Sequence, residues 1–164
     1  MGKIIKVGMA DMNICSPPDI ITTLGLGSCV GLVLYDVRTK LCGLMHIMLP
    51  DSTKIKNNSN RAKFADTAIS DMLEIMKKNG SNIEDIIAKI AGGARMFEYG
   101  ADKKSRGIIS IGDENINAVI EILKCKNIQI ISKDIGKNYG RTIIFDPSNG
   151  NMTIRAVGKT EKII

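Results

Sequence analysis

The sequence predicts a domain of the α+β class, with helices and strands mixed along one chain. Two stretches, Lys63 to Lys78 and about Glu114 to Lys126, repeat their apolar residues at helical spacing. Short β-rich runs lie before, between and after them, in the order strands, helix, strand, helix, strands. No repeat, low-complexity segment or linker divides the 164 residues. We therefore expect a single domain over residues 1–164, long enough to bury a core.

Runs of β-branched and apolar residues, bounded by turn residues, predict the strands. They lie at residues 3–8, 20–24, 30–35, 41–48, 86–91, 128–133, 141–146 and 151–157. A loop that holds Cys15 and Pro17-Pro18 separates the first two strands. The third and fourth runs flank the polar segment Asp36 to Lys40, and this pattern predicts a β-hairpin.

Turn and capping signals bound the helices. Asn79-Gly80 follows the first helix and is a stop signal. Ser81 to Glu84 then has the form of a capping box, which predicts a brief helical turn. Before the first helix, the polar tract Lys54 to Arg61 is predicted to be a mobile loop. Gly92-Gly93 ends the strand predicted at residues 86–91 and begins a loop through Met96-Phe97.

Charge and composition limit the kinds of molecule that the protein is expected to bind. The formal net charge is +6, which favours acidic partners. The basic residues are scattered and aromatic residues are few, so no basic stripe with stacking rings indicates nucleic-acid binding. No apolar run is long enough to span or insert into a membrane. The start of the chain lacks a secretory signal, which predicts a cytoplasmic protein.

Four cysteines occur without a CxxC spacing, at positions 15, 29, 42 and 125. Neither a zinc knuckle nor a redox dithiol motif is therefore present. In a cytoplasmic chain of this size we expect reduced thiols. His46 is the only histidine, which excludes a metal site built from several histidines, and no cofactor is indicated.

The spacing of Cys29 and His46 suggests that the two side chains meet. If the hairpin turn is centred between Val37 and Arg38, the numbers of opposing residues sum to 75, as 29 and 46 do. Opposing side chains have Cβ atoms about 4.5–5.5 Å apart. A slip of one residue would put the two side chains on opposite faces of the sheet.

The glycine-rich segment before Cys29 has two readings. Gly25, Gly27 and Gly31 are spaced GxGxxxG, which misses the dinucleotide pattern by one residue and precedes a strand instead of a helix. A nucleophile loop fits better, because amides near Gly27, Ser28 and Cys29 can stabilise an oxyanion. His46 would then take the thiol proton and form a thiolate–imidazolium pair.

The residues alone leave the roles of several other side chains open. Thr22 or Thr23 is expected to orient the imidazole, because successive strand residues point to opposite faces. Cys29 is equally read as a small buried apolar residue, and His46 as a satisfied core histidine. Cys42 is a poor substitute for Cys29, because it lies about 13 Å from His46 along one strand. Cys125 reads as a packed thiol at the end of a helix.

Six motifs lie along the chain: TLGLGSC at 23–29, HIMLP at 46–50, KFAD at 63–66, KIAGGARMF at 89–97, IGDEN at 111–115 and GRTIIFDPSNG at 140–150. In the same order, they resemble those of the CheD family, the chemoreceptor glutamine deamidases of bacterial and archaeal chemotaxis. The resemblance spans nearly the whole chain, and the pairing of the first two motifs is highly specific. One departure is Gly136-Lys137, where the family commonly has two glycines.

The resemblance implies a layered α/β/β/α arrangement with mixed sheets, papain-like in active-site logic only. It puts the nucleophile on Cys29, the base on His46 and the orienting hydroxyl on Thr23. The implied reaction is hydrolysis of glutamine side chains to glutamate on the helical cytoplasmic region of chemoreceptors, without a cofactor or metal. The implied second partner is the phosphatase CheC, which acts on phosphorylated CheY. Members of the family stimulate this action of CheC.

Two alternatives to this enzyme are kept. The chain could be a docking regulator of CheC or receptors without catalysis, although an intact set of Cys29, His46 and Thr23 argues against that. It could also be another thiol hydrolase or a transglutaminase that uses the same acyl-enzyme.

Overall fold

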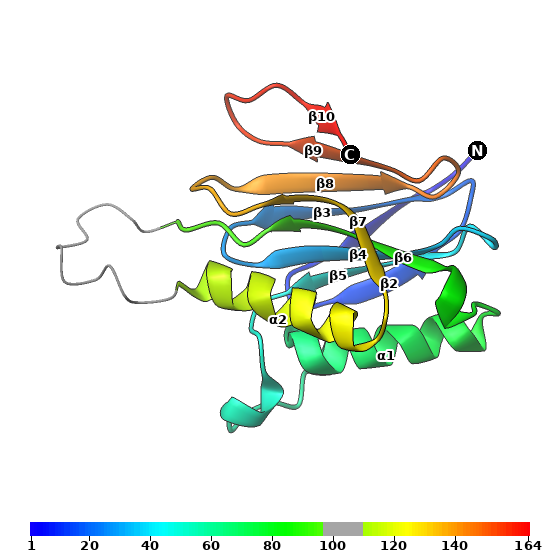
Figure 1. Cartoon of the computed structure of the whole chain (residues 1–164). Helices are drawn as coiled ribbons and strands as arrows, with labels where there is room; N and C mark the ends of the chain where they lie inside the picture. Colours follow the sequence, from blue (N-terminus) through cyan, green and yellow to red (C-terminus); the bar gives the residue numbers. More distant parts are fainter. Residues whose placement is uncertain (97–109) are drawn as a thin grey trace, which may run out of the picture.

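The computed structural model describes residues 1–96 and 110–164, which form ten strands and two α-helices (Figure 1). The strands are β1 (Ile4–Val7), β2 (Met12–Cys15), β3 (Ile20–Leu26), β4 (Val30–Asp36), β5 (Cys42–Ile47), β6 (Ile86–Gly92), β7 (Gln129–Ile135), β8 (Arg141–Asp146), β9 (Asn151–Arg155) and β10 (Lys162–Ile163). The helices are α1 (Ala65–Lys78) and α2 (Ile111–Cys125), with 3₁₀ turns η1 (Ser52–Lys54), η2 (Arg61–Lys63) and η3 (Ile83–Asp85).

The strands form two mixed sheets that pack face to face. The first sheet has the order β1-β3-β8-β9-β10, and the second has the order β2-β5-β4-β6-β7. Side chains from both sheets share one apolar core, in which the rings of Tyr35 and Phe145 meet edge to face with centroids 5.2 Å apart. The α+β class predicted from the sequence and the mixed sheets implied by the resemblance are confirmed. Among the described residues, no helix is long and apolar enough to cross a membrane.

Both helices cover the outer face of the second sheet (Figure 1). Ile69 and Met72 of α1 and Val119 and Leu123 of α2 share a core with that face and are fully buried. The layer order implied by the resemblance, with helices on both outer faces, therefore differs from the order observed. Over residues 1–96 and 110–164 the layers run helix, sheet, sheet, because the apolar stripes of both helices pack on β2, β4, β5 and β6.

The hairpin of β4 and β5 is confirmed, but its register differs by two residues from the expected one. Gly31 opposes His46 and Tyr35 opposes Cys42, so opposing numbers sum to 77. The turn begins later than predicted because Asp36 stays in β4. Its buried carboxylate accepts the amides of Arg38 (2.9 Å) and Thr39 (3.0 Å), and the chain reverses over residues 37–40. A shift of two preserves the faces of the strands, since side chains alternate with period two.

Several boundaries differ from the prediction. Residues 12–15, expected within a loop, form the edge strand β2, and β10 was missed because it has only two residues. The second helix begins three residues early, because the Ser110 side chain caps it by accepting the Asp113 amide (3.2 Å). The turn after Ser81 is present as η3, but its N-cap residue Asn82 makes no side-chain capping bond. Phe97 of the predicted loop lies outside the described residues.

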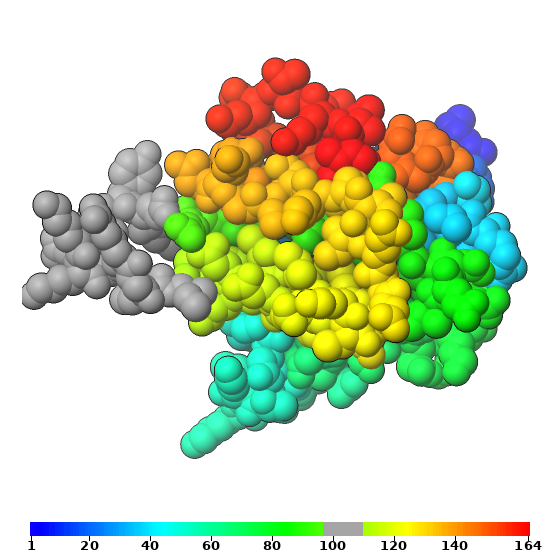
Figure 2. Space-filling view, viewed as in Figure 1, coloured from blue at the N-terminus to red at the C-terminus, as the bar shows by residue number. Residues whose placement is uncertain are grey.

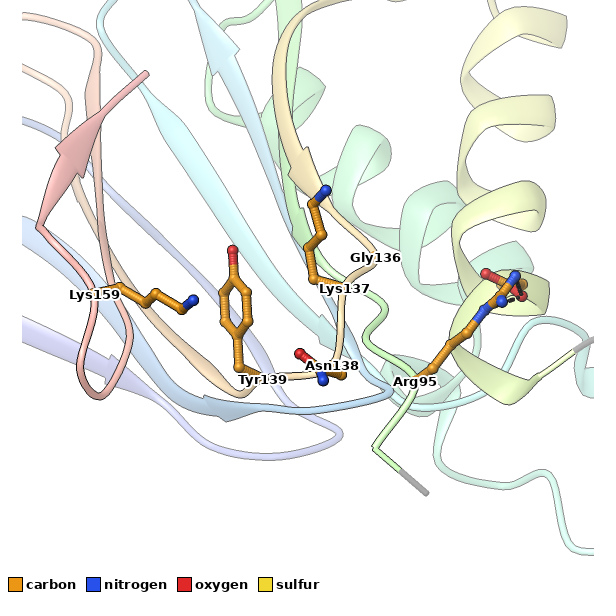
Figure 3. Close-up of a pocket in the computed structure, with 7 residues that line it drawn as sticks. Arg95, Gly136, Lys137, Asn138, Tyr139 and Lys159 are labelled. Carbon is orange, nitrogen blue, oxygen red and sulfur yellow. Dashed lines mark hydrogen bonds and ion pairs between the residues drawn. The ribbon is translucent and has the colours of Figure 1, made fainter. Parts of the chain in front are cut away.

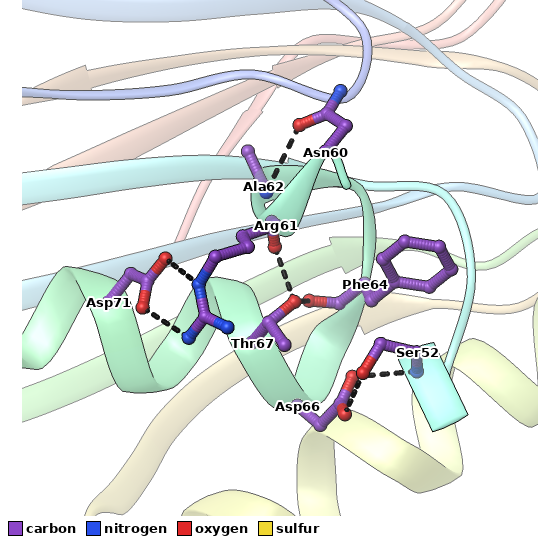
Figure 4. A network of polar contacts seen from close by, with 8 residues as sticks. All are labelled: Ser52, Asn60, Arg61, Ala62, Phe64, Asp66, Thr67 and Asp71. Atoms are coloured by element: carbon purple, nitrogen blue, oxygen red, sulfur yellow. Dashed lines mark hydrogen bonds and ion pairs between the residues drawn. The ribbon is translucent and has the colours of Figure 1, made fainter. Parts of the chain in front are cut away.

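The polar tract predicted to be a mobile loop is anchored at both ends to α1 (Figure 4). The amide and hydroxyl of Ser52 donate to the carboxylate of Asp66, at 3.0 and 2.6 Å. Arg61 makes a two-pronged ion pair with Asp71, at 2.8 and 2.7 Å. Between these anchors the segment projects from the body of the molecule (Figure 2). The acidic residues of the helix face therefore hold a segment that looks unstructured by composition.

Candidate active site

Cys29 and His46 point into the space between the two sheets. Cys29 belongs to the core shared by the sheets and is 7% exposed. His46 is two residues from Leu44, another member of that core, so it shares the face. Cys29 likewise lies two residues before Gly31, which opposes His46 in the ladder. The thiol and the imidazole therefore lie on one face of the second sheet, the thiol directly before β4 and the imidazole on β5.

A glycine opposite His46 makes room for the first sheet. A Cβ atom at Gly31 would lie 2.8 Å from side-chain carbons of both Leu26 and Ile143, which is too close for either. Without a side chain at this position, Leu26 and Ile143 approach the face that carries the imidazole. The close approach brings β3 within reach of His46.

The hydroxyl of Thr23, on β3, lies 2.7 Å from Nδ1 of His46. The same hydroxyl donates to the carbonyl of Val7 at 2.7 Å. A hydroxyl has a single proton to donate, so Thr23 must accept from His46, and we assign the imidazole proton to Nδ1. Thr22 points the other way and donates to the carbonyl of Ile143 (2.7 Å). Of the two candidate hydroxyls, Thr23 is therefore the one in contact with the imidazole.

This assignment leaves Nε2 of His46 without a proton. The atom is buried and has no hydrogen-bond partner among the described residues. A buried acceptor without a partner is costly, so its retention indicates use in binding or chemistry. His46 and Thr23 are fully buried, and Cys29 keeps 7% of its surface exposed.

Burial keeps both groups neutral at rest. It raises the pKa of the Cys29 thiol and lowers the pKa of the His46 imidazole. The thiolate–imidazolium pair expected from the sequence is therefore disfavoured before a substrate arrives. A neutral imidazole at neutral pH is nevertheless the form that accepts a proton from a thiol.

The carbonyl groups of Gly27 and Cys29 attach the glycine-rich loop to the segment that follows β6. The Gly27 carbonyl accepts from the amide of Ala94 and the Cys29 carbonyl from the amide of Gly93, both at 2.8 Å. Gly92 must lack a side chain here, because a Cβ atom would lie 2.4 Å from the Cys29 carbonyl oxygen. The glycine pair predicted to end a strand and begin a loop therefore also docks the glycine-rich loop before Cys29. The amides of Ser28 and Cys29 donate to no acceptor within residues 1–96 and 110–164.

Asn115 of α2 was missed as a residue of this region. Its Nδ2 donates to the carbonyls of Ser28 and Met48, both at 2.9 Å, and the side chain is fully buried. A signal was available in the sequence, because Asn115 lies on the apolar face of the helix beside Ile116 and Val119. A polar side chain on such a face needs a partner inside the protein.

The other three cysteines lie in different settings. Cys15 and Cys42 oppose each other on β2 and β5, with sulfur atoms 3.5 Å apart. This mutual hydrogen bond and then burial raise the pKa of the Cys42 thiol. Cys125 is exposed at the end of α2. None of these three thiols lies beside the glycine-rich loop.

An open cleft of about 600 Å³ is lined by residues 136–139, between β7 and β8, together with Arg95, Asp113 and Lys159 (Figure 3). Arg95 follows the docking segment and pairs with Asp113 at 2.7 Å. Lys137 and Lys159 also line the cleft, with the Lys159 ammonium 5.0 Å from the Tyr139 ring centroid. Lys137 has φ +63°, so the position where the family commonly has glycine keeps a left-handed conformation. The cleft carries more positive than negative groups.

The chain is similar to known proteins over most or all of its length. Residues 48–156 match the family model described as "CheD chemotactic sensory transduction". A relative from Lachnoclostridium phytofermentans is 52% identical over 100% of both chains, and one from Syntrophomonas wolfei is 49% identical over 100% of both. A third, from Caldanaerobacter subterraneus subsp. tengcongensis, is 49% identical over 99% of this chain and 98% of its own. Each is named a probable chemoreceptor glutamine deamidase CheD.

The family-model match and the matches to full-length relatives cover different parts of the candidate site. Thr23, Cys29 and His46 precede residue 48 and lie outside the family-model match, whereas the full-length relatives cover them. A family-model match over more than half of the chain and relatives near 50% identity over their whole length agree with the motifs found in the sequence. The chain belongs to the CheD family.

Proposed function

We propose that this chain is a cysteine amidohydrolase that converts glutamine side chains of chemoreceptors to glutamate. The names of its relatives support this reaction and this substrate. The observation that carries the chemistry is the 2.7 Å contact between Thr23 Oγ1 and His46 Nδ1. It leaves Nε2 unprotonated on the face of the sheet that also carries Cys29.

The first half of the reaction forms a thioester. His46 Nε2 takes the proton of the Cys29 thiol as the sulfur attacks the carbon of the glutamine carboxamide. The negative charge that develops on the carboxamide oxygen is accepted by the amides of Ser28 and Cys29. The tetrahedral intermediate collapses, the carbon–nitrogen bond breaks, and His46 returns its proton to the departing ammonia.

The second half restores the enzyme. Water attacks the thioester while His46 takes one of its protons, and the carbon–sulfur bond breaks. The proton passes to the Cys29 sulfur, and the carboxyl group of glutamate remains on the receptor. The sum is one carboxamide and one water converted to one carboxylic acid and one ammonia, so no metal or redox cofactor is required.

The surface around the thiol suits a protein substrate. Leu24 and Met96 flank the loop and expose 59% and 39% of their surface. Met96 also lies against Gly27, where a Cβ atom would be 3.2 Å from its Cγ. Exposed apolar side chains beside a reactive group are typical of contact with another protein. We place this encounter in the cytoplasm, on the helical region of the receptor.

Ammonia release from a receptor fragment tests the enzyme. Cys29→Ala and His46→Ala should each abolish release, because one lacks the nucleophile and the other the base. Cys125→Ala is the matched control, since it removes an exposed thiol far along α2, and it should keep full activity. Full activity of Cys29→Ala would defeat the mechanism. Incorporation of a primary amine in place of ammonia release would identify a transglutaminase instead.

The second partner is proposed from the family resemblance. We expect the chain to bind the phosphatase CheC and to stimulate its action on phosphorylated CheY. The Cys29→Ala variant separates the two roles: it should still bind CheC in a pull-down although it releases no ammonia. Binding by this variant, together with an inactive wild-type chain, would favour the docking regulator over the enzyme.

A further inference from the structure

Three successive carbonyls of the nucleophile loop are each held by a donor from a neighbouring segment. Main-chain amides of Ala94 and Gly93 hold the outer two, those of Gly27 and Cys29. The middle carbonyl, of Ser28, is held by a side chain, Nδ2 of Asn115 at 2.9 Å. A single substitution can therefore release the middle carbonyl while leaving the main-chain bonds in place.

The carbonyl of Ser28 and the amide of Cys29 belong to the same peptide unit. A peptide unit is planar and trans, so its N–H points opposite to its C=O. The bond from Asn115 to the Ser28 carbonyl therefore sets the direction of the Cys29 N–H, which has no acceptor among the described residues. A free amide on the nucleophile itself is where an oxyanion is stabilised after attack by sulfur.

The second proton of the same amide group reaches the strand that carries the base. Nδ2 of Asn115 donates to the Met48 carbonyl at 2.9 Å, two residues beyond His46. Both acceptors are carbonyl oxygens, so the orientation of the amide group is determined, with Nδ2 toward them and Oδ1 away. Oδ1 is buried and has no partner within residues 1–96 and 110–164. One side chain thus joins the segment before β4, which carries the thiol, to the residue that follows β5, which carries the imidazole.

We propose that Asn115 is a positioning residue that aims the Cys29 amide at the oxyanion and fixes the spacing between Cys29 and His46. The proposal rests on the thiol chemistry proposed above and deepens it. Asn115 does not touch the substrate in this account. It acts through the Ser28–Cys29 peptide, so its loss affects the steps that develop charge on oxygen more than the reactivity of the sulfur.

The test compares two reactions of Cys29 in Asn115→Asp and Asn115→Ala. Asn115→Asp keeps the shape but replaces the donor with an oxygen that repels the two carbonyls, and Asn115→Ala removes the group. A glutamine-like peptide aldehyde forms a hemithioacetal whose oxygen needs the Cys29 amide. Iodoacetamide alkylates the sulfur at a saturated carbon and develops no carbonyl oxyanion. Asn117, exposed two residues along the same helix, provides the matched control Asn117→Ala.

We expect kcat for ammonia release and affinity for the aldehyde to fall about 10²-fold in both variants, as when one oxyanion donor is lost. The rate of Cys29 alkylation, followed by mass spectrometry, should change less than about threefold by the same reasoning, and Asn117→Ala should match the wild type. Equal loss of alkylation and aldehyde affinity, unchanged aldehyde affinity, or unfolding of both variants would overturn the proposal. The aldehyde arm uses no receptor, so a wild-type chain that binds aldehyde but releases no ammonia refutes only the proposed function.

Discussion

At the scale of single residues, the tautomer of His46 follows from the fact that the Thr23 hydroxyl has only one proton to donate. This hydroxyl donates to the Val7 carbonyl and must accept from His46, which determines the tautomer of the imidazole. The sequence offered Thr22 and Thr23 as candidates, and only the pairing of β3 with β1 and β8 shows which way each points. Strand alternation is visible in a sequence, but the identity of the facing sheet is not.

Removal of the Thr23 hydroxyl should therefore impair the base without removing it. In Thr23→Val the Nδ1 proton loses its acceptor, and we expect kcat for ammonia release to fall on the order of 10²-fold, part of the contribution of a general base. Thr23→Ser should restore most of the rate, because it restores the acceptor. Thr22→Val, a neighbour that also loses a buried hydrogen bond, is the control. Equal losses of kcat in the two valine variants would show that Thr23 contributes only through packing.

The pH dependence of the reaction should follow the burial of His46. The imidazole must be neutral to accept a proton, so kcat/KM should rise with pH as His46 loses its proton. Burial lowers the pKa of His46 below its ordinary value of 6.5, so this rise should be centred below pH 6.5. A profile of kcat/KM against pH between 4 and 9 measures it. A rise centred above pH 7 would contradict the assignment of His46 as a neutral, buried base.

At the scale of elements, the hairpin illustrates what sequence patterns can and cannot specify. The apolar runs predicted both strands and the faces of Cys29 and His46, because alternation survives a shift of two residues. The register itself depended on Asp36, whose carboxylate binds amides of the turn while its backbone remains in β4. Such side-chain bonding to the turn is not visible in hydrophobic patterns.

A buried ion pair at the start of β8 is the element-scale feature most open to test. Arg141 is fully buried at its side chain and lies 3.4 Å from Asp134, whose side chain is 8% exposed. It also donates to the Gly136 carbonyl at 2.9 Å, which fastens the loop between β7 and β8 that forms one wall of the cleft. The pair therefore links the edge of the second sheet to the first.

Substitution Arg141→Met should lower the free energy of unfolding by about 3 kcal/mol, because it leaves the Asp134 carboxylate buried with less compensation. Arg155→Met is the control: its pair with Glu161 is largely exposed, and its loss should cost less than about 1 kcal/mol. Urea unfolding of both variants measures the difference. Equal costs in the two would show that the buried pair contributes no more than a surface pair.

At the scale of the whole molecule, the class of fold was predictable from the order of the elements, whereas the layer order was not. Periodicity identified α1 and α2 and the strands of the core. It could not show that both helices pack on the second sheet, because an apolar stripe does not identify the surface it covers. The partners of Asn115 could not be predicted for the same reason, since Ser28 and Met48 are distant from it in sequence.

The net charge of +6 should assist the encounter with an acidic receptor through the cleft in Figure 3. The double substitution Lys137→Glu and Lys159→Glu should raise KM for a receptor fragment about three- to tenfold at low salt, with kcat unchanged. The control, Lys77→Glu with Lys78→Glu, reverses the same charge at the far end of α1 (Figure 1). Equal effects of the two pairs would mean that only overall charge matters, and no effect of either would remove the cleft from recognition.

The state of the imidazole is the most direct test of the central claim, that His46 presents an unprotonated Nε2 to the Cys29 sulfur. His46 is the only histidine, so ¹⁵N NMR of the chain without a histidine tag contains one imidazole. At pH 7 we predict a protonated Nδ1 and an unprotonated Nε2 whose shift changes in Cys29→Ala and stays constant in Cys125→Ala. A proton on Nε2, or an Nε2 shift that does not respond to the loss of the Cys29 thiol, would contradict the account.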